Sequence, residues 1–136
     1  MNRETAILRL MFMWGAIVAL PLVLVSLQAV FGKYGEDSPL AWNWLLGQFS
    51  PPIALITAAY FSEASARWKN GTANATRWRL AVSLSLLQGF VVLALLLSEP
   101  LLALKPYVLF DQLGLVFTLI QGLVVGALGA VVFDGR

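Results

Sequence analysis

The stretch Leu119-Ile120-Gln121-Gly122-Leu123-Val124-Val125-Gly126-Ala127-Leu128-Gly129-Ala130 decides the fold class of this chain, because it is the centre of an apolar segment long enough to cross a lipid bilayer. A single uncharged amide, Gln121, lies within it among glycines and other small residues. An earlier stretch, residues 86–95 (LLQGFVVLAL), matches its first ten residues at seven positions. Both stretches predict membrane-spanning helices, although a match between apolar stretches of low complexity is weak evidence for an internal repeat.

The composition of the whole chain supports a membrane protein. Of its 136 residues, 60% are hydrophobic and only 12% are charged, whereas a soluble domain carries about 25% charged residues. So few charges in so short a chain predict a lipid-facing surface and a single transmembrane domain over residues 1–136. The net charge of +2 gives no nucleic-acid signature.

The absence of cysteine and histidine limits the chemistry that the chain can perform. It excludes disulfides, Cys/His zinc sites, His-ligated haem and catalysis by Ser-His or Cys-His pairs. We therefore expect no cofactor, no metal and no enzymatic activity. The connections between the apolar segments are also too short to form a soluble domain.

The apolar segments predict an all-α bundle of four transmembrane helices with short loops. The spans are expected at about residues 7–31, 51–68, 78–97 and 108–133. The first would reach about 37 Å, which exceeds the ~30 Å hydrocarbon core, and Pro21 should kink it. A cleaved signal peptide is the competing interpretation, since Arg3 and Arg9 come first, but the segment is too long for a typical signal core.

Residues 42–49 have two interpretations within this helical pattern. They precede Ser50-Pro51-Pro52, in which Ser50 could cap a helix and Pro51 could occupy its first position. We therefore expect residues 42–49 to form a short interfacial segment that ends at the prolines, with the second span beginning at Pro51. The alternative is one long, kinked helix from Trp42 onward.

Basic residues predict the orientation. With four spans, seven of the nine basic residues fall on one side of the membrane, namely Arg3, Arg9, Arg67, Lys69, Arg77, Arg79 and Arg136. The other side holds Lys33 and Lys105. Because basic loops remain in the cytoplasm, both termini are expected there, in a bacterial inner (plasma) membrane.

The loop after the second span contains two matches to the N-glycosylation pattern, at Asn70-Gly71-Thr72 and Asn74-Ala75-Thr76. Such sites have no meaning on the cytoplasmic side. We therefore interpret the first as a turn and expect Asn74 or Thr76 to cap the next helix.

Small residues recur every four positions, which places them on one face of each helix. The stripes are Ala54, Ala58, Ser62 and Ala66; Ala81, Ser85 and Gly89; Thr118, Gly122, Gly126 and Ala130; and, more weakly, Gly15 and Ala19. Small faces let helix backbones approach closely in lipid. The simpler interpretation is that these small faces pack against one another within the monomer. The more specific alternative is that one of them, at Gly122 and Gly126, forms an interface between subunits.

Two mid-span amides, Gln88 and Gln121, are the main polar candidates. Their spans should be antiparallel neighbours, so we expect the two amides to meet and to hold the helices together. The alternative is that they line a pore together with Ser85 and Thr118.

Ionisable residues near the spans form a second set of candidates. Glu63 and Arg67 are one helical turn apart and could form an interfacial ion pair or, less simply, Glu63 could be a proton or cation site. Asp111 should lie at the outer start of the fourth span, where the helix dipole favours an acid.

These features favour a small non-enzymatic membrane subunit, such as an anchor, an assembly factor or a membrane effector. Its partners would be the lipid bilayer and either further copies of itself or another membrane protein. The alternative is a small oligomeric channel or transporter with a polar path along the third and fourth spans. An intramembrane enzyme is the weakest interpretation, because few catalytic residue sets are available.

Overall fold

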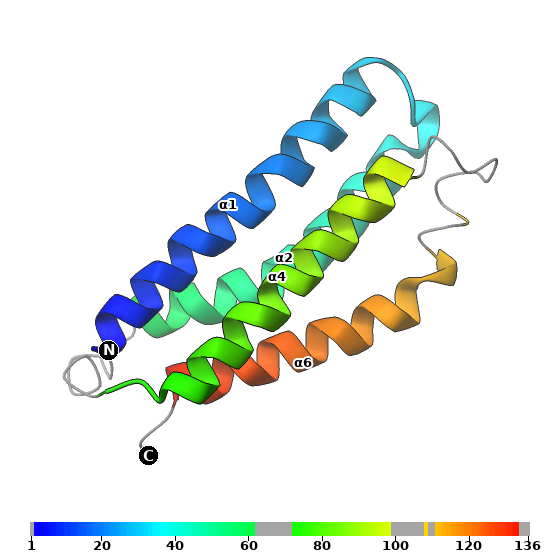
Figure 1. Ribbon diagram of the computed structural model, residues 1–136. Coiled ribbons are helices and arrows are strands. Elements are labelled where there is room, and N and C mark those ends of the chain that lie inside the picture. The colour runs from blue at the N-terminus through cyan, green and yellow to red at the C-terminus, as the bar shows by residue number, and fades with distance from the viewer. Residues whose placement is uncertain (1, 62–71, 99–107, 109–110, 134–136) are drawn as a thin grey trace.

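The computed structural model describes residues 2–61, 72–98, 108 and 111–133, which form a bundle of four α-helices (Figure 1). The helices are α1 (Arg3–Val30), α2 (Ser38–Phe61), α4 (Ala75–Ser98) and α6 (Gly114–Val132), and a short 3₁₀ helix, η1 (Gly35–Asp37), precedes α2. The predicted all-α, four-helix architecture is confirmed.

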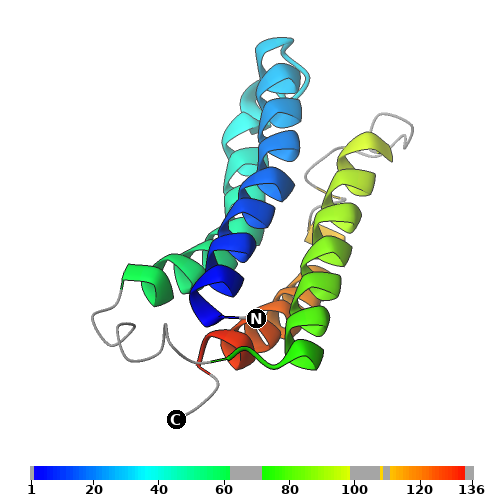
Figure 2. The ribbon, with the colours of Figure 1, turned by 60° about the vertical axis from the view of Figure 1, so that its left-hand side comes forward.

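Each helix packs mainly against two neighbours. Both α1 and α6 contact α2 and α4, so α2 and α4 face each other across the bundle. The N-terminal ends of α1 and α4 and the C-terminal end of α6 lie at the same end of the bundle (Figures 1 and 2). At this end Asn2 and Thr72 form an isolated antiparallel bridge. We call this the basic end, because it carries the described residues Arg3, Arg9, Arg77 and Arg79.

The outer surface of the bundle is apolar. Large hydrophobic side chains such as Phe12, Phe90 and Leu115 are exposed, while Trp14 and Phe117 fill the core. By length and composition, α1, α4 and α6 can each cross a membrane, whereas α2 is less apolar. A water-exposed surface of this kind would be unfavourable, so the protein is an integral membrane protein.

A Schellman motif ends α1. The Gly32 N–H donates to the Ala29 carbonyl at 3.0 Å, and the Lys33 N–H donates to the Gln28 carbonyl at 2.9 Å. Gly32 has a φ of 72°, which only glycine adopts without strain. The buried Tyr34 hydroxyl then donates to the Gln28 side-chain oxygen, which fixes the turn against α1.

Asn74 caps the start of α4. Its side-chain oxygen accepts hydrogen bonds from the backbone N–H groups of Thr76, at 2.9 Å, and Arg77, at 3.3 Å. The expected capping role is therefore confirmed at Asn74, and Thr76 supplies a backbone N–H to the cap.

The expected break in α2 is wrong. The helix is continuous from Ser38 to Phe61 and contains both Pro51 and Pro52, so residues 42–49 are part of α2. Ser50 does not cap a helix; its hydroxyl donates to the Leu46 carbonyl, one turn earlier, at 2.6 Å. The helix can continue because neighbouring helices supply hydrogen bonds where the prolines cannot.

The remaining boundaries differ from expectation by a few residues. α1 begins earlier than residue 7 and runs through Pro21, and α4 begins at Ala75. α6 begins at Gly114, after a turn at Leu113, while the expected span began at 108. The expected part of the second span after Phe61 lies outside the described residues.

Candidate functional site

The two adjacent prolines of α2 create a local need for hydrogen bonds. In an α-helix, each N–H bonds to the carbonyl four residues earlier. Proline has no N–H, so Pro51 leaves the Gly47 carbonyl without its helical donor, and Pro52 does the same to the Gln48 carbonyl. Inside a bilayer, each unsatisfied backbone group costs several kcal/mol.

Amides from two other helices satisfy these carbonyls. The Gln121 Nε2 of α6 donates to the Gly47 carbonyl at 2.7 Å. The Gln88 Nε2 of α4 donates to the Gln48 carbonyl at 2.7 Å, across the bundle. The two bonds therefore match the two carbonyls that the prolines leave free, and they connect three of the four helices.

The expected hydrogen bond between Gln88 and Gln121 is not present; each amide instead bonds to the α2 backbone. The two glutamines do hold helices together, but their partner is α2. The reason is energetic. Leaving a backbone carbonyl without a donor inside the bilayer costs more free energy than is gained from a hydrogen bond between two glutamines.

These groups form a polar centre, which we define as Gln48, Ser85, Gln88, the half-buried Gln121 and the carbonyl of the exposed Gly47. Ser85 and Gln88 are completely buried and Gln48 is 8% exposed. Three of its oxygens have no hydrogen-bond partner in the part of the chain that the structure describes: Gln48 Oε1, Ser85 Oγ and Gln88 Oε1. The centre therefore holds uncharged donors and acceptors, and its buried oxygens have spare capacity to accept hydrogen bonds.

The small-residue stripe of α4 faces the interior. Ala81, Ser85 and Gly89 are all buried. A Cβ atom built on Gly89 would lie 2.6 Å from the Ile17 Cγ2 of α1, which is closer than atoms can approach. Glycine at position 89 therefore allows α1 and α4 to pack closely.

The stripe of α6 faces outward. Thr118, Gly122, Gly126 and Ala130 are all exposed, and a Cβ on either glycine would meet nothing within 4 Å. The Thr118 hydroxyl bonds to the Gly114 carbonyl of its own helix at 2.8 Å. In α1 and α2, the described stripe residues Gly15, Ala19, Ala54 and Ala58 are also exposed, whereas Ser62 and Ala66 lie outside the described residues.

The ionisable candidates are mostly separate from the polar centre. Glu63 and Arg67 lie outside the described residues, so their ion pair stays a prediction. Asp111 is exposed before the start of α6. Arg3, in contrast, is only 7% exposed at the basic end, and its Nε has no hydrogen-bond partner among residues 2–61, 72–98, 108 and 111–133.

Two features of the site were missed in the sequence. Gln48 is not among the candidates from the sequence. However, Gly47 and Gln48 lie four residues before Pro51 and Pro52, and this spacing identifies the two carbonyls that need donors. Trp14 is 1% exposed, and its indole N–H has no partner among the described residues; its position beside a cavity could not be read from the sequence.

Comparison with known proteins gives no further assignment: no protein-family model, curated protein or solved structure matches the chain.

Proposed function

We propose that this protein is a non-enzymatic subunit of a membrane assembly, and that its copies associate through the outward stripe of α6. The observation that carries the proposal is the exposure of Thr118, Gly122, Gly126 and Ala130 on one helix face. Without a hydrophobic driving force between helices in lipid, close packing of small faces is a main source of association. Among the described residues nothing covers Gly122 or Gly126 within 4 Å of a Cβ, so this face can receive a second copy.

The orientation belongs to the same proposal. We place the protein in a bacterial inner membrane with its basic end, and hence both termini, in the cytoplasm. The described cations support this arrangement, because Arg3, Arg9, Arg77 and Arg79 lie at one end and Lys33 lies at the other.

The test is a leucine substitution in the stripe. Gly126→Leu adds a side chain where a Cβ meets nothing within 4 Å, so the monomer should fold normally. The bulk should block close approach of a second helix and reduce the mass of the complex in mild detergent to that of a monomer, as measured by light scattering.

The matched control is Ala94→Leu, which enlarges an exposed residue on α4 outside the stripe. It should leave the mass of the complex unchanged. A native protein that is already monomeric, or an oligomer that survives Gly126→Leu, would contradict self-association. In that case the protein would act as a subunit through a complex with a different membrane protein, and Gly126→Leu would leave that complex unchanged.

A small channel is the second candidate, and the three unpartnered oxygens of the polar centre favour it. An ion or water path needs hydrogen-bonding groups in the interior. Gln121→Leu should abolish ion flux into liposomes if the amide lines the path. Adding Pro51→Ala would restore the helical donor to the Gly47 carbonyl. Flux that returns in the double variant would assign Gln121 a structural role, and flux that stays absent would support the path.

A further inference from the structure

A continuous groove separates α1 from α2 on the outer surface of the bundle. Its first part lies near Trp14 and has a volume of about 120 Å³, and its second part extends to Leu22 and has a volume of about 490 Å³. The two parts share Ile53 and Thr57 in their walls. From Met11 to Leu22 the groove follows α1 for about 16 Å, at 1.5 Å per residue.

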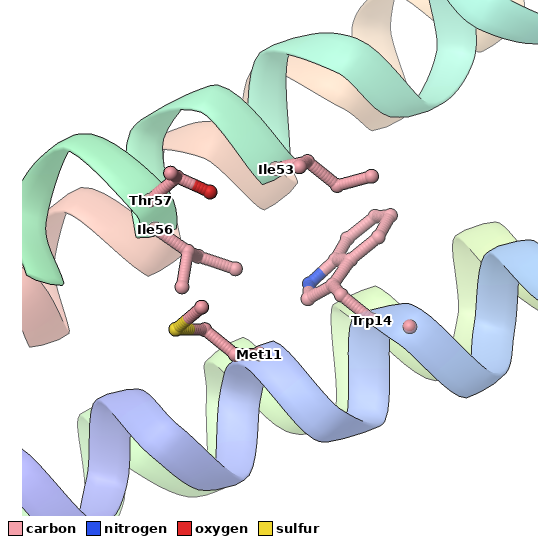
Figure 3. Close-up of a pocket in the computed structure, with 6 residues that line it drawn as sticks. Met11, Trp14, Ile53, Ile56 and Thr57 are labelled. Atoms are coloured by element: carbon pink, nitrogen blue, oxygen red, sulfur yellow. The ribbon is translucent and has the colours of Figure 1, made fainter.

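The walls of the groove are apolar except at one end. Its first part is lined by Met11, Trp14, Gly15, Ile53, Ile56 and Thr57 (Figure 3). In Figure 3 the indole nitrogen of Trp14 and the hydroxyl of Thr57 are both turned toward the space between the helices. Ser50, in the second part, already donates its hydroxyl proton to the Leu46 carbonyl.

The Trp14 N–H is a buried donor without an acceptor. Its nitrogen has no hydrogen-bond partner among the described residues, and the whole side chain is 1% exposed. The ring is fixed by an edge contact with Phe49, at 6.1 Å between centroids. A donor held in place and left unpaired in an apolar wall indicates that an acceptor comes from outside the chain.

Water does not fit this space well. About four waters would be needed to fill 120 Å³, at ~30 Å³ each, and every one would need two to four polar partners. The walls supply only the Trp14 N–H and the Thr57 hydroxyl. A long apolar molecule with one acceptor at its end needs no further polar groups.

The depth of the donor identifies the acceptor. Trp14 lies five residues, or about 7 Å, farther into the bundle than the exposed Arg9 on the same helix. With the charged Arg9 at the level of the lipid headgroups, this depth falls near the boundary between headgroups and acyl chains, where the acceptors that lipids offer are the ester carbonyls. The remaining groove then runs toward the bilayer centre, as an acyl chain does.

We propose that the groove between α1 and α2 binds one acyl chain of a membrane phospholipid, and that it opens at Trp14, whose indole nitrogen is otherwise covered, so that the ester carbonyl of the lipid accepts a hydrogen bond from the indole N–H. The chain lies along the apolar walls formed by Val18, Leu22, Phe49 and Ile53. The Trp14 bond distinguishes this lipid from the lipids that cover the other apolar faces.

The test compares two lipids that differ only in the acceptor. The full chain in detergent is titrated with diacyl phosphatidylglycerol or with the dialkyl ether of the same chain lengths, and bound lipid is counted by native mass spectrometry. The ester lipid should bind about five-fold more tightly, as expected for one hydrogen bond. This comparison uses the native protein and does not depend on any variant.

Three variants assign the difference to the groove. Trp14→Phe removes the N–H and keeps an aromatic ring, so the affinity for the ester lipid should fall to that for the ether lipid. Gly15 lines the groove, so Gly15→Leu places a side chain in its open space and should weaken the binding of both lipids. Trp44→Phe, at a tryptophan that packs against Phe117 and lies outside the groove, should change neither.

Equal binding of the ester and ether lipids overturns the proposal, as does an ester preference that survives Trp14→Phe. Failure to retain either lipid also overturns it and leaves water as the occupant. A groove that is covered by a second copy of the chain would instead appear as a dimer without bound lipid, and Gly15→Leu would then dissociate the dimer.

Discussion

Proline at position 52 leaves the Gln48 carbonyl to the Gln88 amide, so the two residues should be energetically coupled. Gln88→Leu removes the donor and buries an unpaired carbonyl, which should lower the free energy of unfolding by about 1–3 kcal/mol. Pro52→Ala restores an N–H in the helix. In the Pro52→Ala background, Gln88→Leu should therefore cost clearly less, as measured by a double-mutant cycle of unfolding in mixed micelles.

Pro51→Ala is the matched control for this cycle, because its new N–H faces the Gly47 carbonyl, which Gln121 serves. It should not reduce the cost of Gln88→Leu, but it should reduce the cost of Gln121→Leu. If each proline variant rescued both glutamine variants equally, the pairwise assignment would be contradicted and a general effect of proline on α2 would be indicated.

Gly89 allows the close approach of α1, and its substitution should be costly. In Gly89→Ala the new methyl group would meet the Ile17 Cγ2 at 2.6 Å, and a β-branched side chain has little freedom to move away. We expect a loss of about 1–3 kcal/mol, the usual range for overpacking, in the same unfolding assay. Gly122→Ala, at the matching position of α6, meets nothing within 4 Å and should not destabilise the monomer.

At the scale of the helices, Asn74 determines where α4 begins. Asn74→Ala removes the acceptor for two backbone N–H groups and should cost about 1 kcal/mol, with faster hydrogen exchange confined to the first turn of α4. Thr76→Ala is the control, since Thr76 contributes only its backbone N–H to the cap. Equal effects from the two substitutions would show that the side chain of Asn74 is not the cap.

The existence of the helices could be predicted from local apolar patterns, but the continuity of α2 could not. Proline in a helix interior predicts a break when only the local chain is considered. In α2 the missing donors come from Gln88 and Gln121, and only the packed bundle brings these amides to the Gly47 and Gln48 carbonyls. The continuity of α2 is therefore a tertiary effect.

The sequence also could not predict whether each small-residue stripe faces the interior or the surface of the bundle. Residues 86–95 and 119–128 match at seven positions, yet Gly89 is buried against Ile17 while Gly122 is exposed. A four-residue spacing defines a helix face, but the rotation of the helix in the bundle decides whether that face is inside. The candidate glutamines could be selected from residue type and depth, whereas their backbone partners could not.

For the whole molecule, the number of membrane crossings is the main expectation to test. α2 is less apolar than the other three helices, and the side on which the chain ends depends on whether α2 crosses. Four crossings place both termini on the same side, and the basic residues predict that this side is the cytoplasm, so a fluorescent reporter fused to the C-terminus should be active there. The control is a reporter inserted in the turn at Gly35–Asp37, which should report the opposite side.

A C-terminal reporter that is active only outside the cell would contradict this topology and, with the N-terminus in the cytoplasm, would mean an odd number of crossings. In that case α2 would lie along the membrane surface, and its hydrogen bonds with Gln88 and Gln121 would have to be absent in the native protein.

The dependence of α2 on distant amides has a consequence for synthesis on the ribosome. The donors for its two free carbonyls lie 40 and 74 residues later in the chain. At 5–20 residues per second, the second donor is made roughly 4–15 s after its acceptor. During this interval α2 is poorly suited to lipid, so its stable insertion must wait for α4 and α6, and a nascent chain that stops before Gln121 would expose α2 to membrane quality control.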